Sequence, residues 1–83
     1  MKSMGQTANK LLLALCMEGR MVSMDQRRFW SRNYEKMMTK YTVKEADPES
    51  GRKTKLLETY KLSAVVELLA AMYAETVGAG QGD

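Results

Sequence analysis

The sequence contains no histidine and only one cysteine, Cys16. Without histidine the chain cannot assemble a Ser-His-Asp or Cys-His catalytic site, and one cysteine is too few for any usual set of zinc ligands. The few glycines lie at expected helix ends, in a turn and in the C-terminal tail, so there is no glycine-rich phosphate-binding loop. We therefore predict a protein that is not an enzyme and that binds no metal or cofactor.

The scarcity of cysteine and of long apolar runs also bears on the compartment. A single cysteine excludes an intramolecular disulfide, and an 83-residue chain without disulfides is typical of a reducing cytoplasm. The apolar run at residues 11–17 is too short to span a bilayer and lacks the cleavage pattern of a signal peptide. We expect a cytoplasmic protein with no membrane contact, in which Cys16 is a small core side chain.

The composition is that of one small folded domain. Hydrophobic residues make up 45% of the chain and charged residues 28%, which suits a single core near the lower size limit. We predict one domain over residues 1–83, ordered over about residues 7–78, because residues 1–6 and 79–83 show no periodic pattern.

The formal net charge of +3 is concentrated in the middle of the chain. Seven cations and two anions lie in residues 20–44, whereas residues 62–83 carry only anions. Such a bipolar surface can orient a protein on a polyanion or an acidic partner, or it can simply keep a small domain soluble. The charge distribution alone favours neither interpretation.

Two helices are predicted near the ends of the chain. The first begins at Thr7 or Asn9, either of which can cap it, and stops at Gly19 in a left-handed conformation. The second is capped by Ser63 and ends at Gly78. Each carries an apolar stripe at helical spacing, which we expect to face the core. In the first helix the stripe is Leu11, Leu12, Leu15 and Met17, and Leu13 and Cys16 broaden it. In the second helix it is Val65, Val66, Leu69, Met72, Tyr73 and Val77.

Residues 20–36 fit two kinds of structure. A strand over residues 20–31, followed by a turn at residues 32–36, places several apolar side chains on one face, although polar residues interrupt the alternation. A helix over residues 24–38 begins with a capping-box pattern and places aromatic residues at steps of four. We favour the strand and keep the helix as the alternative.

The following hairpin has a clearer pattern. Residues 37–46 alternate as a half-buried strand does, residues 47–51 (DPESG) form a turn, and residues 54–62 return as a strand with Leu57 as the one exception to the alternation. If these strands pair symmetrically about the turn, one face is cationic and the other packs against the helices. The cationic face is Lys40, Lys44, Lys55 and Lys61, and the core-facing residues are Tyr41, Val43, Leu56 and Tyr60.

The predicted fold class is therefore α+β. It consists of a single small domain with a helix, a three-stranded antiparallel meander and a second helix. If residues 24–38 are helical instead, the order becomes α-α-β-β-α.

The most distinctive passage is residues 27–44, where cationic side chains alternate with aromatic ones. Cations attract phosphates or acidic protein surfaces, and aromatic faces stack or anchor a partner. In the competing interpretation, Trp30 fills the core and the cations only solvate a strand face. We expect Trp30 to lie in the core. For the arginines, partner binding and simple solvation of the strand are equally favoured. The predicted partner-binding residues are Arg27, Arg28, Trp30, Arg32, Lys36, Lys40, Lys44, Lys55 and Lys61.

Eight methionines are many for a chain of this length. Methionine fills irregular gaps in cores, and it also forms adaptable apolar patches on protein-binding surfaces. We expect core positions for Met17, Met37 and Met72, and a surface patch formed by Met21, Met24 and Met38.

The layout around FWSRNYEKMMTKYTVKE, with LLALCMEGR before it and VVELLAAMYAE after it, resembles that of small accessory proteins encoded by phages and conjugative elements of Gram-positive bacteria. The resemblance covers residues 10–77. It implies a bacterial host and a setting in which short proteins block host machinery, as anti-CRISPR proteins block Cas nucleases, or bind the element's own DNA.

We therefore expect a non-enzymatic interaction protein that blocks a larger host protein or protein–nucleic acid complex through its basic and aromatic face. Inhibition of a Cas nuclease is the most specific form of this hypothesis. The alternative is a small DNA-binding accessory module that places the same face on phosphates. We expect either protein to be a monomer or a homodimer.

Overall fold

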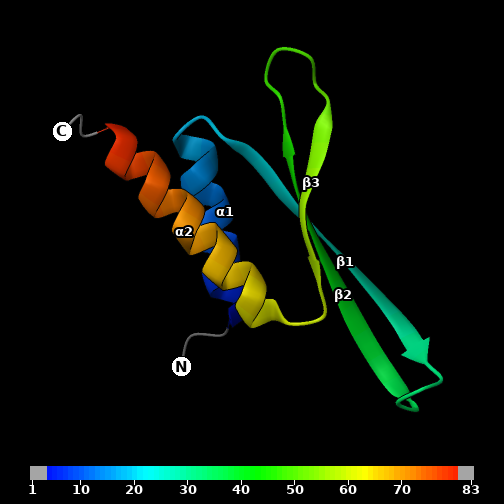
Figure 1. Cartoon of the computed structure of the whole chain (residues 1–83). Helices are drawn as coiled ribbons and strands as arrows, with labels where there is room; N and C mark the ends of the chain where they lie inside the picture. The colour runs from blue at the N-terminus through cyan, green and yellow to red at the C-terminus, as the bar shows by residue number, and fades with distance from the viewer. Residues whose placement is uncertain (1–3, 81–83) are drawn as a thin grey trace.

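The computed structural model of the chain describes residues 4–80, which form two helices and three strands (Figure 1). The elements are α1 (Met4–Met17), β1 (Met21–Ser31), β2 (Lys36–Ala46), β3 (Lys53–Thr59) and α2 (Leu62–Gly80). The strands form one antiparallel sheet in the order β1-β2-β3, and both helices lie on the same side of it. The predicted α+β fold is confirmed, and residues 24–38 are a hairpin, not a helix.

The register of the sheet assigns each side chain to a face. β1 and β2 pair along their whole lengths, from Met21 opposite Ala46 to Ser31 opposite Lys36, whereas β3 pairs only with residues 41–46 of β2. Because side chains alternate along a strand, even-numbered residues of β1 and odd-numbered residues of β2 point toward the helices. We call this side the helix-side face and the opposite side the outer face.

The core lies between the two helices and the part of the sheet where all three strands meet. Val43, in the middle strand, is fully buried and packs with residues of both helices. The buried core residues are Ala8, Leu15, Val43, Val65, Leu69 and Met72. Within residues 4–80, neither helix has both the length and the apolar character needed to cross a bilayer.

The helix boundaries differ from the predicted ones. α1 begins at Met4, ahead of Thr7 and Asn9, so neither of these residues is its cap, and the buried Ala8 lies in its second turn. α2 begins at Leu62, so Ser63 is not its cap. It also continues past Gly78 to Gly80. Of the loose ends predicted at residues 1–6 and 79–83, residues 4–6 belong to α1 and residues 79–80 to α2, and residues 1–3 and 81–83 lie outside the described residues.

Not all apolar side chains of α1 pack against the core. Leu13 is 63% exposed and Met17 80% exposed, and Cys16 is exposed as well, so the expectation that these three side chains are buried is wrong. Helical geometry turns them away, because only residues spaced like Ala8, Leu12 and Leu15 share the face toward the sheet and α2.

Gly19 ends α1 as predicted, with a positive φ of 88°. The Gly19 amide donates to the Cys16 carbonyl at 3.0 Å, and the Arg20 amide donates to the Leu15 carbonyl at 2.9 Å. This pair of hydrogen bonds is the Schellman arrangement, which satisfies two carbonyls at the end of a helix and needs a left-handed residue. The chain thereby reverses from α1 into β1.

Replacing Gly19 with alanine is expected to lower the free energy of unfolding by about 1 kcal/mol, because a side chain disfavours the left-handed conformation. A Cβ at Gly19 meets no atom within 4 Å, so the cost is conformational and not steric. Gly78→Ala is the matched control, since Gly78 is helical and equally open. We expect it to stabilise by about 0.5 kcal/mol. Denaturant unfolding of both variants tests the opposite signs.

Candidate binding surface on the β1–β2 arm

The far half of the β1–β2 hairpin projects beyond the helices, toward the lower right of Figure 1. We call residues 27–40 the arm. Within residues 4–80, no core residue and no side chain packed against the core comes from the arm; the nearest are Met24 and Tyr41. The turn at residues 32–35 closes the hairpin, with Glu35 in a left-handed conformation at a φ of 50°. Both faces of the arm are therefore free of the helices.

Strand pairing places two different sets of side chains on the two faces of the arm. The helix-side face carries Trp30 beside Met37, and Trp30 is 60% exposed. The expected core positions of both residues are wrong, because α1 and α2 do not extend over this part of the hairpin. The outer face carries the pairs Arg27–Lys40, Phe29–Met38 and Ser31–Lys36.

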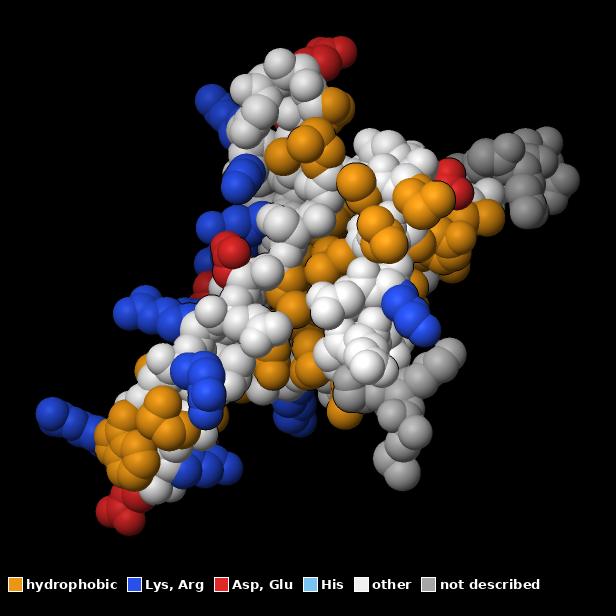
Figure 2. Space-filling view, turned by 180° about the vertical axis from the view of Figure 1, so that it is seen from behind, with side chains coloured by type: hydrophobic (Ala, Val, Ile, Leu, Met, Phe, Trp, Pro, Cys, Tyr) orange, Lys and Arg blue, Asp and Glu red, His pale blue; other side chains and the backbone are white. Residues whose placement is uncertain are grey.

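A hollow of about 420 Å³ lies on the outer face of the arm, and Phe29, Tyr34, Met38 and Tyr60 form its apolar lining. The rings of Phe29 and Tyr60 have centroids 6.0 Å apart and are tilted by 56°, a favourable arrangement for two aromatic rings. Lys36 also lines this hollow. In Figure 2, apolar side chains gather at the end of the arm, at the lower left, and Lys and Arg side chains project around them.

Four of the predicted binding residues are cations of the arm without an ion pair in the part of the chain that the structure describes. Arg27, Arg28, Arg32 and Lys36 form no ion pair with another residue in the described range 4–80. All four are exposed, with Arg27 on the outer face, Arg28 on the helix-side face and Arg32 in the turn. The arm thus combines unneutralised positive charge with exposed aromatic side chains.

Three other predicted binding residues, Lys40 at the base of the arm and Lys44 and Lys55 beyond it, are paired with acids. Lys40 lies 2.7 Å and Lys55 2.9 Å from the two carboxylate oxygens of Glu58, and Lys44 lies 4.0 Å from Asp25. All five groups are on the outer face, so the like-charge repulsion expected there is relieved by acids within the same face. This part of the surface offers little net charge to a partner.

Hydrogen bonds from Lys40 and Lys55 lower the pKa of Glu58 from 4.5 to about 2. A carboxylate whose folded-state pKa lies below its unfolded value stabilises the fold fully above the unfolded pKa, and this contribution disappears as the pH falls through the folded pKa. We expect the melting temperature to fall between pH 4.5 and about pH 2, and Glu58→Gln to flatten part of that fall. Thermal melts followed by circular dichroism test this, with the same substitution at Glu49, in the β2–β3 turn and without an ion pair within residues 4–80, for comparison.

The remaining predicted lysine, Lys61, does not belong to the sheet. It lies between β3 and α2, and its backbone amide donates to Thr59 Oγ1 at 3.1 Å. The predicted cationic face therefore holds Lys40, Lys44 and Lys55 without Lys61.

A β-bulge in β3 explains why the predicted faces of this strand are wrong. Val43 pairs with Leu57 and Lys44 with Lys55, so Leu56 has no partner and the alternation shifts by one residue. Leu57 then faces the core, Leu56 is exposed, and Tyr60 reaches Phe29 on the outer face. The sequence signal was the exceptional Leu57, which marked the shift. Because of this shift, Tyr60 belongs to the candidate site, although the sequence pattern predicted that it faces the core.

The methionines are distributed differently from the prediction. Met72 is buried as expected, but Met21, Met24 and Met38 do not form one patch. Met24 packs against the core, whereas Met21 and Met38 lie near opposite ends of the outer face. Only Met38 contributes to the hollow of the arm.

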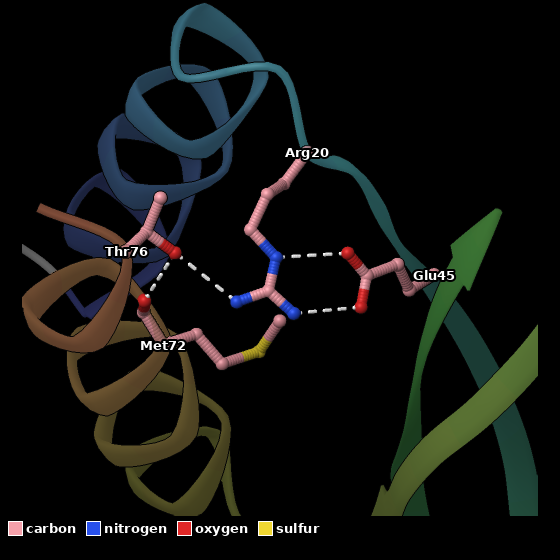
Figure 3. A network of polar contacts seen from close by, with 4 residues as sticks. All are labelled: Arg20, Glu45, Met72 and Thr76. Carbon is pink, nitrogen blue, oxygen red and sulfur yellow. Dashed lines mark hydrogen bonds and ion pairs between the residues drawn. The ribbon is translucent and has the colours of Figure 1, made fainter. Parts of the chain in front are cut away.

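A charged clamp holds the near end of the hairpin to α2 (Figure 3). The Arg20 guanidinium donates to both carboxylate oxygens of Glu45 at 2.8 Å and to Thr76 Oγ1 at 3.1 Å, and the Thr76 hydroxyl donates to the Met72 carbonyl at 2.7 Å. Hydrogen bonding raises the pKa of Arg20 and lowers the pKa of Glu45. The clamp is structural, because it connects the α1–β1 turn, β2 and α2 and so sets the direction in which the arm leaves the helices.

Comparison with protein-family models, curated proteins and solved structures finds no match. Within residues 4–80, no cluster of three or more His, Cys, Asp or Glu side chains is placed to hold a metal ion.

Proposed function

We propose that this chain is a non-enzymatic interaction protein that binds and blocks an acidic surface of a larger protein with the outer face of its arm. The observation that carries the proposal is the segregation of charge. Lys40, Lys44 and Lys55 are paired with acids. In contrast, four arm cations form no ion pair within residues 4–80 and lie around exposed aromatic side chains, namely Arg27, Arg28, Arg32 and Lys36. Unpaired cations can meet an acidic surface without breaking an internal ion pair, and they accelerate encounter with it.

The hollow on the arm supports a protein as the partner. Hot spots at protein interfaces are well-packed pockets rich in aromatic residues and arginine, with a polar rim that excludes water. Phe29, Tyr34 and Tyr60 supply such a pocket, with Lys36 at its side. An apolar side chain of an acidic partner fits this arrangement.

The number of free cations on the arm also favours a protein over duplex DNA. Four cations neutralise about four phosphates at most, which gives a log–log salt slope of about −3.6 and weak non-specific affinity at physiological salt. Electrostatic attraction of this size raises the rate of association with a protein partner, but it does not by itself give high affinity for DNA.

DNA binding is the second candidate, and one observation favours it. The tilted Phe29–Tyr60 ring pair lies beside Arg27 and Lys40, which together line a second hollow of about 290 Å³. Aromatic faces next to cations are what unpaired bases and their phosphates require. A module of this type would bind single strands more tightly than duplex.

The biological setting of the proposal rests on the layout resemblance to accessory proteins of phages and conjugative elements. Its most specific form is inhibition of a Cas nuclease. A cleavage assay with purified nuclease, guide and target DNA tests that form, with loss of cleavage at stoichiometric protein as the expected result.

A capture experiment from bacterial lysate, with the chain as bait and with or without nuclease treatment, separates the two candidates. We expect the captured protein to survive nuclease treatment and to bind the purified chain directly. Fluorescence anisotropy with labelled single-stranded and duplex DNA is the companion measurement. Capture that disappears with nuclease, together with salt-dependent binding of single strands, would replace the first candidate with the second.

A further inference from the structure

β1 has a long edge that is not paired with another strand of the described residues. β1 has 11 residues and pairs on one side only, with β2, so within residues 4–80 its other edge has no strand partner. Alternate residues of an edge strand direct their N–H and C=O groups outward, where another strand can pair with them. From this edge and the observations below, we infer that the chain forms a two-fold symmetric homodimer by antiparallel pairing of β1 with β1 of a second copy.

Charge favours one register of this pairing over the two registers next to it. Centred on Gln26, the register places Asp25 opposite Arg27 of the second copy, and this happens twice because of the two-fold axis. Shifting the centre to Asp25 or to Arg27 places identical charges opposite each other, which is unfavourable. Asp25 is 70% exposed and its ion pair with Lys44 is long, at 4.0 Å, while Arg27 has no ion pair within residues 4–80, so both side chains can form these cross-strand pairs.

The same register covers the exposed apolar residues on the helix-side face of the arm. It brings Trp30 of one copy next to Val22 of the other, where Val22 packs against the core beneath the helices. Met37, the partner of Trp30 within the chain, extends this row. The apolar layer between helices and sheet would thus continue from one copy into the other, forming a six-stranded sheet with all four helices on one side.

The size and shape of the single chain agree with a missing partner. Its radius of gyration is 14.5 Å, compared with about 12 Å for a compact chain of this length. Its accessible surface of 6414 Å² exceeds the roughly 5,000 Å² of a typical monomer of this size by about 1,400 Å². A standard interface removes about 800 Å² from each partner, so the excess is sufficient.

The dimer leaves the proposed partner-binding hollow open. Phe29, Tyr34, Met38 and Tyr60 lie on the outer face or in the turn, and the pairing edge does not pass over them. A dimer would present two such hollows on one continuous face. The dimer does not depend on the proposed function, because it is argued from the open edge of β1. Its Asp25–Arg27 pairs lie on the outer face, so Arg27 is neutralised in the dimer, whereas Lys36 remains beside each hollow.

A charge-swap series measured by light scattering over a range of protein concentrations tests the inference. We expect the natural chain to show twice the monomer mass, and Asp25→Arg and Arg27→Asp each to weaken dimerisation by about tenfold or more, because each creates two like-charge pairs. The double variant restores opposite charges and should recover dimerisation. A monomer at every concentration, or a double variant no better than the single ones, overturns the inference.

A cysteine cross-link provides a test that does not rely on charge. In the Cys16→Ser background, Gln26→Cys places two thiols opposite each other at the two-fold axis, within the Cα separation that disulfides require. Mild oxidation should give a covalent dimer. Glu49→Cys, in the β2–β3 turn far from the axis, is the matched control and should remain monomeric under denaturing conditions. Equal cross-linking of the two variants contradicts the register.

Discussion

Replacing Leu69 with alanine is expected to lower the free energy of unfolding by about 3 kcal/mol and the melting temperature by roughly 15 °C. Leu69 of α2 is fully buried in a core of only six buried side chains within the described residues. Removing most of its side chain loses apolar burial and leaves a cavity in that core, and both effects lower the stability. A chain of this size has only about 4–12 kcal/mol of stability, so the change removes a large share of it.

Leu13→Ala is the matched control for that substitution. It deletes the same atoms from a helix, but Leu13 is 63% exposed, so its effect should stay within about 0.5 kcal/mol. Chemical denaturation at one fixed protein concentration measures both variants. Equal losses at the two positions would show that the core is not where the helices meet Val43.

Reversing two arm cations is expected to have the largest effect on partner binding. Arg32→Glu with Lys36→Glu turns two unpaired cations into anions, one that lines the aromatic hollow (Lys36) and one in the turn of the arm (Arg32), which lowers the formal net charge from +3 to −1. Against an acidic surface, attraction becomes repulsion, and we expect at least a roughly tenfold loss of affinity, most of it in the association rate at low salt.

The control for that variant makes the same charge change elsewhere. Arg52→Glu with Lys53→Glu also replaces two exposed cations without an ion pair, at the opposite end of the sheet. It should bind the partner with affinity close to that of the natural chain. If both variants lose affinity equally, net charge and not the arm determines binding. Neither variant touches Asp25, Gln26 or Arg27, so the dimer is unaffected.

The order of elements could be predicted from sequence because local patterns determine it. The turn at residues 47–51 and the left-handed Gly19 each have a local chemical signature, and both are confirmed. The choice of strand for residues 20–31 is confirmed as well, with β1 at Met21–Ser31. Alternation of side chains was enough to assign Tyr41 and Val43 to the core side of β2.

The candidate site could be predicted only in part, because it depends on packing between distant elements. The sequence located the cationic and aromatic passage, but how far α1 and α2 extend over the hairpin decides whether Trp30 is buried, and no local pattern contains that information. In the same way, the bulge at Leu56 moves Tyr60 to the outer face. Pairing of Lys40 and Lys55 with Glu58 follows from that shift.

Backbone amide hydrogen exchange, compared between the free chain and its complex with the captured protein, tests most directly whether the arm is the binding surface. Exchange reports the opening of individual backbone amides and so locates a contact without any substitution. We predict added protection in residues 27–40 and at Tyr60, with the β2–β3 turn and the exposed surface of α2 unchanged. Added protection in α1 and α2 with an unchanged arm would contradict the proposal.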